Sequence, residues 1–214
     1  MSQHADKDTK TPPATYHHGD LRSALIAEAQ KIIERDGPAK VSLRGVAKAA
    51  GVSSAAPYHH FKDKQALLAA VAANGFRAFT RTMIDRGAPA ATAEERLQLL
   101  GVGYVEYAVR HAQLFRLMQG PAFEGIDPKS DFCQARKESA VPLINAVSAC
   151  LPGATQGQIK KACAGAWSMV HGMAVLCNDG RLSYMIDIND LEAAALSITR
   201  QLNVTSVLSG DATV

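Results

Sequence analysis

Apolar residues recur along most of the chain at spacings of three and four, which is the period of amphipathic helices. No segment alternates apolar and polar residues over the length of a strand. The pattern predicts helices over about 20–36, 43–50, 54–60, 63–86, 94–110, 111–118, 131–151, 155–178 and 188–203. The predicted fold class is therefore all-α.

Polar residues, glycines and prolines mark the ends of these segments. The expected N-caps of the first four helices are Asp20, Ser42, Ser53 and Asp63. Gly51 stands just after the second helix, where a glycine can adopt the conformation that ends a helix. Pro142 either kinks the 131–151 helix or marks its start, because proline has no backbone N–H to donate.

The stretch Gly-Ala-Pro-Ala-Ala-Thr at 87–92 interrupts the helical pattern and divides the chain. The last predicted helix carries an apolar seam that suits packing of helix on helix. We expect a disordered tail over 1–15, a small helical domain over 16–62, a connecting helix over 63–86, a larger helical domain over 87–205 and a tail over 206–214.

The composition is that of a globular protein, with 47% hydrophobic and 20% charged residues among 214. No apolar run approaches the roughly 18 residues of a membrane-spanning helix. The first fifteen residues lack the apolar stretch of a signal peptide. These features predict a cytoplasmic protein that does not enter a membrane.

Residue patterns typical of metal sites do not occur. The four cysteines lie far apart, without a Cys-x-x-Cys pair, and are expected to be reduced thiols: Cys133, Cys150, Cys163 and Cys177. Adjacent histidines occur at 17–18 and 59–60, but neighbouring side chains on a helix point about 100° apart and rarely bind one ion. We expect neither a metal nor a cofactor.

Charge is distributed unevenly around a formal net charge of +3. Residues 1–86 hold 13 Lys and Arg against 8 Asp and Glu, whereas residues 87–214 hold 10 against 12. A basic N-terminal part beside a mildly acidic remainder favours a polyanionic partner, although a solvated basic face gives the same pattern.

The short helices predicted over 43–50 and 54–60 are separated by a tight turn at Gly51 and Val52, within this basic part. Two short helices joined in this way fit a helix-turn-helix, whose second helix enters the DNA major groove. Ser54, Ala55 and Ala56 are small enough to allow a close approach to DNA.

The stretch from Ser42 to Val71, SLRGVAKAAGVSSAAPYHHFKDKQALLAAV, resembles the DNA-binding core of TetR-family transcriptional regulators. That family shows R-x-V/I-A-x-x-A-G-V-S followed by Y-x-H-F-x-x-K-x-x-L-L. Further stretches resemble one branch of the family, named for a Trp-His-Gly sequence in its C-terminal domain: YHHGDLR, HAQLFRLMQGPAF and AWSMVHG.

The resemblance implies roles for individual residues. Tyr58 and Lys64 occupy positions that grip phosphates, and Ser42 makes a similar backbone contact. The full set of implied DNA-binding residues is Ser42, Arg44, Ser53, Ser54, Ala55, Ala56, Tyr58, His59, His60 and Lys64. Pro57 departs from the family pattern, which has leucine there more often, and the alanines offer only methyl contacts. Arg44 and DNA shape are therefore expected to carry much of the specificity.

The resemblance also implies a C-terminal domain that dimerises through the last two helices and binds a small-molecule effector. Trp167 and His171 lie four residues apart and share one helix face, either as packed core residues or as walls of an effector cavity. The candidate effector-pocket residues are Tyr104, Phe115, Met118, Phe123, Trp167 and His171.

The implied function is that of a homodimeric repressor, which binds a pseudo-palindromic operator in double-stranded DNA and is released by its effector. A constitutive DNA-binding protein without ligand control is the main alternative. A small helical enzyme is the other alternative, but no clustered titratable site or phosphate-binding loop stands out, so we do not expect catalysis.

Overall fold

The computed structural model describes residues 18–187, 190–202 and 204–205. Every regular element within these residues is a helix, which confirms the all-α prediction. The α-helices are α1 (His18–Asp36), α2 (Leu43–Ala49), α3 (Lys64–Gly87), α4 (Ala93–Arg110), α5 (Ala112–Gln119), α6 (Asp131–Glu138), α7 (Val141–Cys150), α8 (Gln156–Asn178) and α9 (Leu191–Thr199). Three short 3-10 helices are η1 (Pro38–Lys40), η2 (Ala56–His59) and η3 (Pro121–Phe123). The tails predicted at 1–15 and 206–214 lie outside the described residues.

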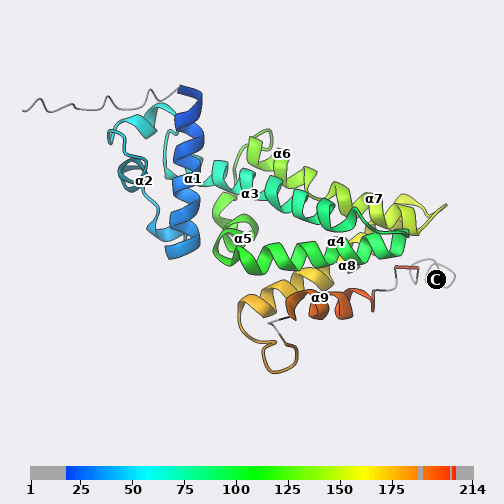
Figure 1. The fold of residues 1–214 in the computed structure, drawn as a ribbon. Helices are drawn as coiled ribbons and strands as arrows, with labels where there is room; N and C mark the ends of the chain where they lie inside the picture. Colours follow the sequence, from blue (N-terminus) through cyan, green and yellow to red (C-terminus); the bar gives the residue numbers. More distant parts are fainter. Residues whose placement is uncertain (1–17, 188–189, 203, 206–214) are drawn as a thin grey trace, which may run out of the picture.

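The helices form two groups joined by α3 (Figure 1). At one end of the molecule, α1 and α2 pack together with the start of α3. In the second group, α3 packs against α4, α5 and α6, and α4 packs against α7, α8 and α9. Helix α3 thus contributes to both groups.

Helices α3 and α4 are buried on all sides over much of their length. Residues 67–73 of α3 are buried without interruption, and so are residues 100–108 of α4. This agrees with the sequence of α4, which is apolar around most of its circumference and predicts a buried helix. One continuous apolar core therefore runs through both groups of helices.

Two of the predicted N-caps are confirmed by their hydrogen bonds. Ser42 Oγ accepts from the backbone N–H of Gly45 at 3.0 Å, and Asp63 Oδ1 accepts from that of Ala66 at 2.7 Å. The prediction for Asp20 is wrong, because the backbone is already helical at His18. An acidic residue is favourable at the N-cap and in the first helical turn alike, so the sequence signal does not separate these two positions.

The helix predicted over 131–151 is divided into α6 and α7. Pro142 lies in the first turn of α7, where its missing N–H would have had no helical partner. Pro142 therefore marks the start of a helix, one of the two outcomes that the sequence allows. The last helix is shorter than the predicted 188–203, since α9 begins after the N-cap Asp190 and ends at Thr199. After α9, the N–H groups of residues 201 and 202 donate to the carbonyls three residues earlier, which form turns and not a continued α-helix. Residues 188, 189 and 203 lie outside the described part.

An ion-pair cluster joins the C-terminal end of α3 to α4 and α9. The guanidinium of Arg86 donates to both carboxylate oxygens of Glu106, at 2.9 and 2.5 Å, and to Glu192 Oε2 at 2.6 Å. Glu106 is only 4% exposed, in the buried stretch of α4. The hydrogen bonds from Arg86 hold the pKa of Glu106 below its ordinary value, and those to Glu106 and Glu192 raise the pKa of Arg86.

Replacing Arg86 by methionine leaves Glu106 buried without its strongest partner. We expect Arg86→Met to lower the free energy of unfolding at pH 7 by roughly 3 kcal/mol, as measured by urea denaturation. The control is Arg110→Met, because Arg110 lies 3.8 Å from Glu106 and is mostly exposed, so its loss should cost less than about 1 kcal/mol.

This difference between wild type and Arg86→Met should depend on pH. The folded-state pKa of Glu106 is depressed, so its stabilising effect is present above the unfolded-state pKa and is lost as the pH falls through the folded-state value. The stability gap should therefore narrow in acid. Equal losses from the two arginine substitutions at neutral pH would contradict a specific role for Arg86.

Candidate nucleic-acid interface

The turn after α2 is closed by Gly51, as the sequence predicts. Gly51 has a φ of 69°, in the left-handed region that favours glycine. Its N–H donates to the carbonyl of Lys48 at 3.2 Å, and the N–H of Val52 donates to that of Ala47 at 3.0 Å. These two bonds form a Schellman motif, which ends α2 and directs the chain into the next segment.

The segment after this turn is not the α-helix predicted over 54–60, and Ser53 is not its side-chain cap. It is a turn followed by the single 3-10 element η2, with no side-chain cap. The N–H of Ala56 donates to the carbonyl of Ser53 at 3.0 Å, and the N–H of Tyr58 to that of Ala55 at 3.1 Å.

The physical reason is Pro57. An α-helix over these residues needs a bond from the N–H of residue 57 to the carbonyl of Ser53, and proline has no such N–H. Its ring would also collide with that carbonyl, so the chain tightens into i to i+3 bonds. Pro57 is buried and fills an apolar position, as a leucine would.

Most of the predicted DNA-binding residues lie at the surface. Ser42, Arg44, Ser53, Ser54, Ala55, Tyr58 and His59 are exposed, whereas Ala56, His60 and Lys64 are half-buried. Tyr58, at 53% exposure, is one of the most exposed large hydrophobic residues described. Its neighbours Pro57 and Phe61 are buried, so η2 presents Tyr58 outward from an anchored turn.

Exposed cationic side chains lie on and beside this surface. Arg44, Lys48 and Lys62 are exposed, and none makes an ion pair with a residue that the structure describes. A cluster of uncompensated cations raises the local concentration of anions such as phosphates.

Two of the predicted phosphate-binding residues also have structural roles. Lys64 Nζ donates to the carbonyl of Ala39 at 3.0 Å and so ties α3 to η1. An ammonium has three donors, which leaves others for a phosphate. Ser42 uses an oxygen lone pair for its cap, so its hydroxyl proton remains able to donate.

In the C-terminal group, four of the six predicted effector-pocket residues meet. The indole N–H of Trp167 donates to Tyr104 Oη at 3.2 Å, and Tyr104 Oη lies 2.9 Å from His171 Nδ1. The ring of Phe115 lies 5.8 Å from that of Tyr104 and 5.9 Å from that of His171, measured between centroids. The aromatic cluster is defined here as Tyr104, Phe115, Trp167 and His171.

Protonation in the aromatic cluster follows from burial. Burial raises the pKa of Tyr104 to about 12, so the phenol stays protonated well above neutral pH. Burial also lowers the pKa of His171, which favours the neutral form of its ring. Trp167 is 49% exposed, so its outer edge faces away from the core.

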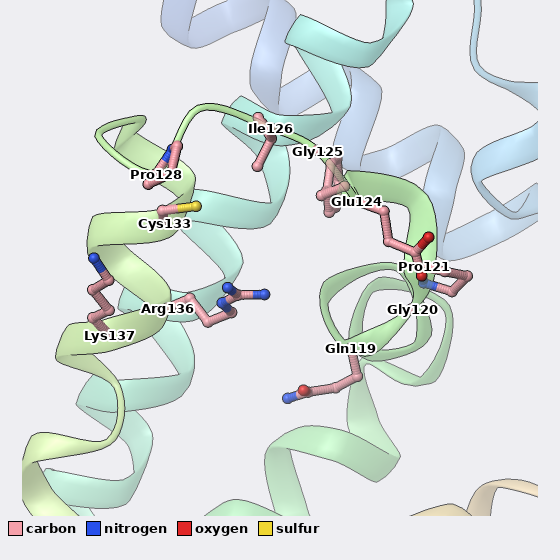
Figure 2. Close-up of a pocket in the computed structure, with 11 residues that line it drawn as sticks. Gln119, Gly120, Pro121, Glu124, Gly125, Ile126, Pro128, Cys133, Arg136 and Lys137 are labelled. Carbon is pink, nitrogen blue, oxygen red and sulfur yellow. The ribbon is translucent and has the colours of Figure 1, made fainter.

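Met118 and Phe123 make other contacts. Met118 is buried beside Gly75 of α3, and the ring of Phe123 packs on that of Phe132 at 4.3 Å between centroids. Phe123 lines an open hollow of about 570 Å³ between the end of α5, residues 120–128 and α6 (Figure 2). Sequence reasoning missed this hollow, and Phe123 is the single residue that it shares with the candidates.

Two negative findings concern the described residues. They contain no group of three or more His, Cys, Asp or Glu side chains placed to hold a metal ion. They also contain no helix long and apolar enough to cross a membrane.

Solved structures with this fold come from several bacteria. A protein of unknown function from Rhodococcus sp. RHA1 is 32% identical, with a TM-score of 0.72 over 88% of this chain and 98% of that one. A tetR-family transcriptional regulator from Streptomyces coelicolor is 19% identical, with a TM-score of 0.68 over 89% and 81%. The TetR family transcriptional regulator PfmR from Thermus thermophilus is 19% identical, with a TM-score of 0.61 over 85% and 94%. No curated protein matches the chain.

Two family descriptions match separate parts of the chain. Residues 25–71, from α1 to the first half of α3, match the bacterial regulatory proteins of the tetR family. Residues 97–199, from α4 to the end of α9, match the tetracyclin repressor-like C-terminal domain. The Trp-His-Gly branch is not assigned by these matches and stays a prediction. The chain, with its helix-turn-helix end and its helical C-terminal part, belongs to the TetR family of bacterial regulatory proteins.

Proposed function

We propose that the protein is a homodimeric transcriptional repressor that binds a pseudo-palindromic operator and is released by a small-molecule effector. Residues 16–62 serve as its DNA-binding domain, and residues 87–205 as its effector and dimerisation domain. The observation that carries the proposal is the exposed surface of α2 and η2, with its uncompensated cations, in a chain of this family.

Contacts to the DNA backbone come from residues around this surface. The hydroxyl of Ser42, the phenol of Tyr58 and the ammonium of Lys64 each have a donor free for a phosphate. Such contacts set the position and orientation of the protein on the duplex.

Base readout falls on few side chains. Arg44 is exposed on α2, and an arginine can donate two hydrogen bonds to a guanine. Ser53, Ser54, Ala55 and Ala56 are small enough to allow close approach. The two alanines offer only methyl contacts, whereas the serine hydroxyls and the rings of His59 and His60 can donate or accept. With η2 only four residues long, sequence-dependent DNA shape carries a large share of the specificity.

A second copy of the chain is the proposed occupant of one face of α8. This face carries Ala164, Gly165, Ser168 and Gly172 at helical spacing and continues into Val175 and Leu176, which are 38% and 39% exposed. A Cβ added at Gly165 or Gly172 would meet no atom of the same chain within 4 Å. Small residues allow two helices to approach closely, and the apolar end gains from burial.

Effector release works through α3, which belongs to both groups of helices. A ligand that binds one orientation of α3 better than another changes the distance between the two DNA-binding domains of the dimer. The affinity for the operator then falls. The hollow beside α5 and α6 supports ligand control over constitutive binding.

The phosphate role of Lys64 predicts a change in salt dependence. We expect Lys64→Ala to weaken binding about equally on all DNA sequences and to lower the slope of log K against log salt by about 1 per protomer, measured by fluorescence anisotropy. The control is Lys129→Ala, an exposed lysine in the loop before α6, which should leave the slope unchanged. An unchanged slope for Lys64→Ala would remove Lys64 from the phosphate contacts.

The base-reading role of Arg44 predicts a change in preference. Arg44→Ala should relax selection at particular operator positions, read out by selecting bound sequences from a random DNA pool. Each lost contact should cost about 1–3 kcal/mol of discrimination at its position. Lys48→Ala, on the same helix, is the matched control and should weaken binding to all DNA sequences alike. A uniform loss with Arg44→Ala reassigns this side chain to the backbone.

If this face of α8 is the dimer interface, a substitution that disrupts it should yield a folded monomer. Leu176→Asp places a charge in the second copy's interface but is tolerated in the monomer, where residue 176 is exposed. Sedimentation velocity should show a monomer with unchanged helicity. The control Ile84→Asp, at a half-exposed position of α3, should stay dimeric. A stable dimer of Leu176→Asp would argue against this face of α8 as the dimer interface.

A further inference from the structure

The hollow beside α5 and α6 has walls of two kinds. Its apolar lining comes from Pro121, Phe123, Ile126, Pro128 and Cys133. A volume of about 570 Å³ falls within the range of pockets that hold small organic molecules.

The polar lining carries an excess of positive charge. Arg136 and Lys137 come from α6, against one acidic residue, Glu124, on the opposite segment. Figure 2 shows Arg136 and Gln119 extending toward each other from opposite sides of the hollow. The guanidinium of Arg136 and the side-chain amide of Gln119 therefore converge on the space between α5 and α6.

Arg136 differs from several other arginines of the C-terminal group. Arg77, Arg86 and Arg116 each donate to a carboxylate, of Asp131, Glu106 and Asp179 respectively. Arg136 lies over the ring of Phe132, at 5.5 Å from the centroid, and makes no ion pair with a described residue. Stacking on the ring orients the guanidinium and leaves its N–H groups free.

We propose that this hollow binds an organic carboxylate with an apolar body, and that Arg136 receives the carboxylate. The fork of a guanidinium matches the two oxygens of a carboxylate, and the bond is charge-assisted. The apolar walls receive the body of the ligand, and Gln119 adds a donor beside Arg136. The inference rests on the proposed function and gives its effector a chemical class.

The hollow is connected directly to the DNA-binding end. The carbonyl of Ala122, in η3, accepts a hydrogen bond from the side-chain amide of Gln65 at 3.2 Å. Gln65 is the second residue of α3 and follows Lys64. Movement of η3 by a ligand therefore reaches the start of α3 through one hydrogen bond.

The segment 124–126 provides a second connection. It lines the ligand hollow and also a neighbouring hollow of about 440 Å³, whose other wall includes Arg22, Lys62 and Gln65. A ligand that displaces this shared wall changes the packing against both α1 and α3. Occupancy of the hollow thereby biases the orientation of the DNA-binding end.

The ligand site is tested on the free protein by isothermal titration calorimetry, without DNA. The probes are octanoate and naphthoate, each paired with the primary amide of the same skeleton. We expect at least one carboxylate to bind about 10-fold or more tightly than its amide, because only the carboxylate gains the charge-assisted bond.

Arg136→Gln should remove this preference, lowering carboxylate affinity roughly 10-fold to 100-fold while leaving amide affinity unchanged. The control is Arg81→Gln, which removes the same charge from an exposed position of α3 and should change neither affinity. If no carboxylate outbinds its amide, or if the preference survives in Arg136→Gln, the proposed site is wrong.

The connection to DNA is tested with the carboxylate that binds most tightly. It should weaken operator binding of the wild type at least several-fold, and this effect should be lost in Gln65→Ala but kept in the control Gln201→Ala. An undiminished effect in Gln65→Ala overturns the proposed connection. If the wild type binds no DNA, the proposed function fails, whereas the calorimetry still decides whether the hollow takes a carboxylate.

Discussion

The structure depends on the burial of α3. Its residues 67–73 are enclosed on all sides, so one helix supplies core contacts to the helix-turn-helix end and to the C-terminal group at once. Close packing against α4 requires glycine at 103, because a Cβ there would lie 3.0 Å from the backbone of Met83 and Thr82. Gly75 likewise leaves room for Met118. The two groups cannot separate without exposing this shared core.

Polar contacts along α3 determine how it is oriented within that core. Gln65 bonds to Ala122 at one end, Arg77 pairs with Asp131 of α6 in the middle, and Arg86 pairs with Glu106 and Glu192 at the other end. Apolar packing is non-directional, whereas these contacts have defined geometry. The proposed regulation requires two orientations of α3 of similar free energy, and contacts of this kind are where a ligand would favour one over the other.

The aromatic cluster and the hollow offer different environments in the same domain. Tyr104 joins Trp167 and His171 in a hydrogen-bonded set, which binds α4 to α8 close to the proposed dimer face. The hollow is open, and its cations Arg136 and Lys137 form no ion pair with a carboxylate in the described part of the chain. The hollow has space for the proposed effector, and the aromatic cluster packs α4 against α8, the helix that carries the proposed dimer face.

Local sequence determined the helical segments, the caps at Ser42 and Asp63 and the turn at Gly51, because these depend on groups within about five residues of one another. The effect of Pro57 is equally local, yet the regular family pattern obscured it. Tertiary structure alone decided that Tyr104 meets Trp167, that Arg86 reaches Glu192 and that Arg136 faces an open hollow. Helix period tells which face of a segment is apolar, but packing decides which distant faces meet and where they leave a space.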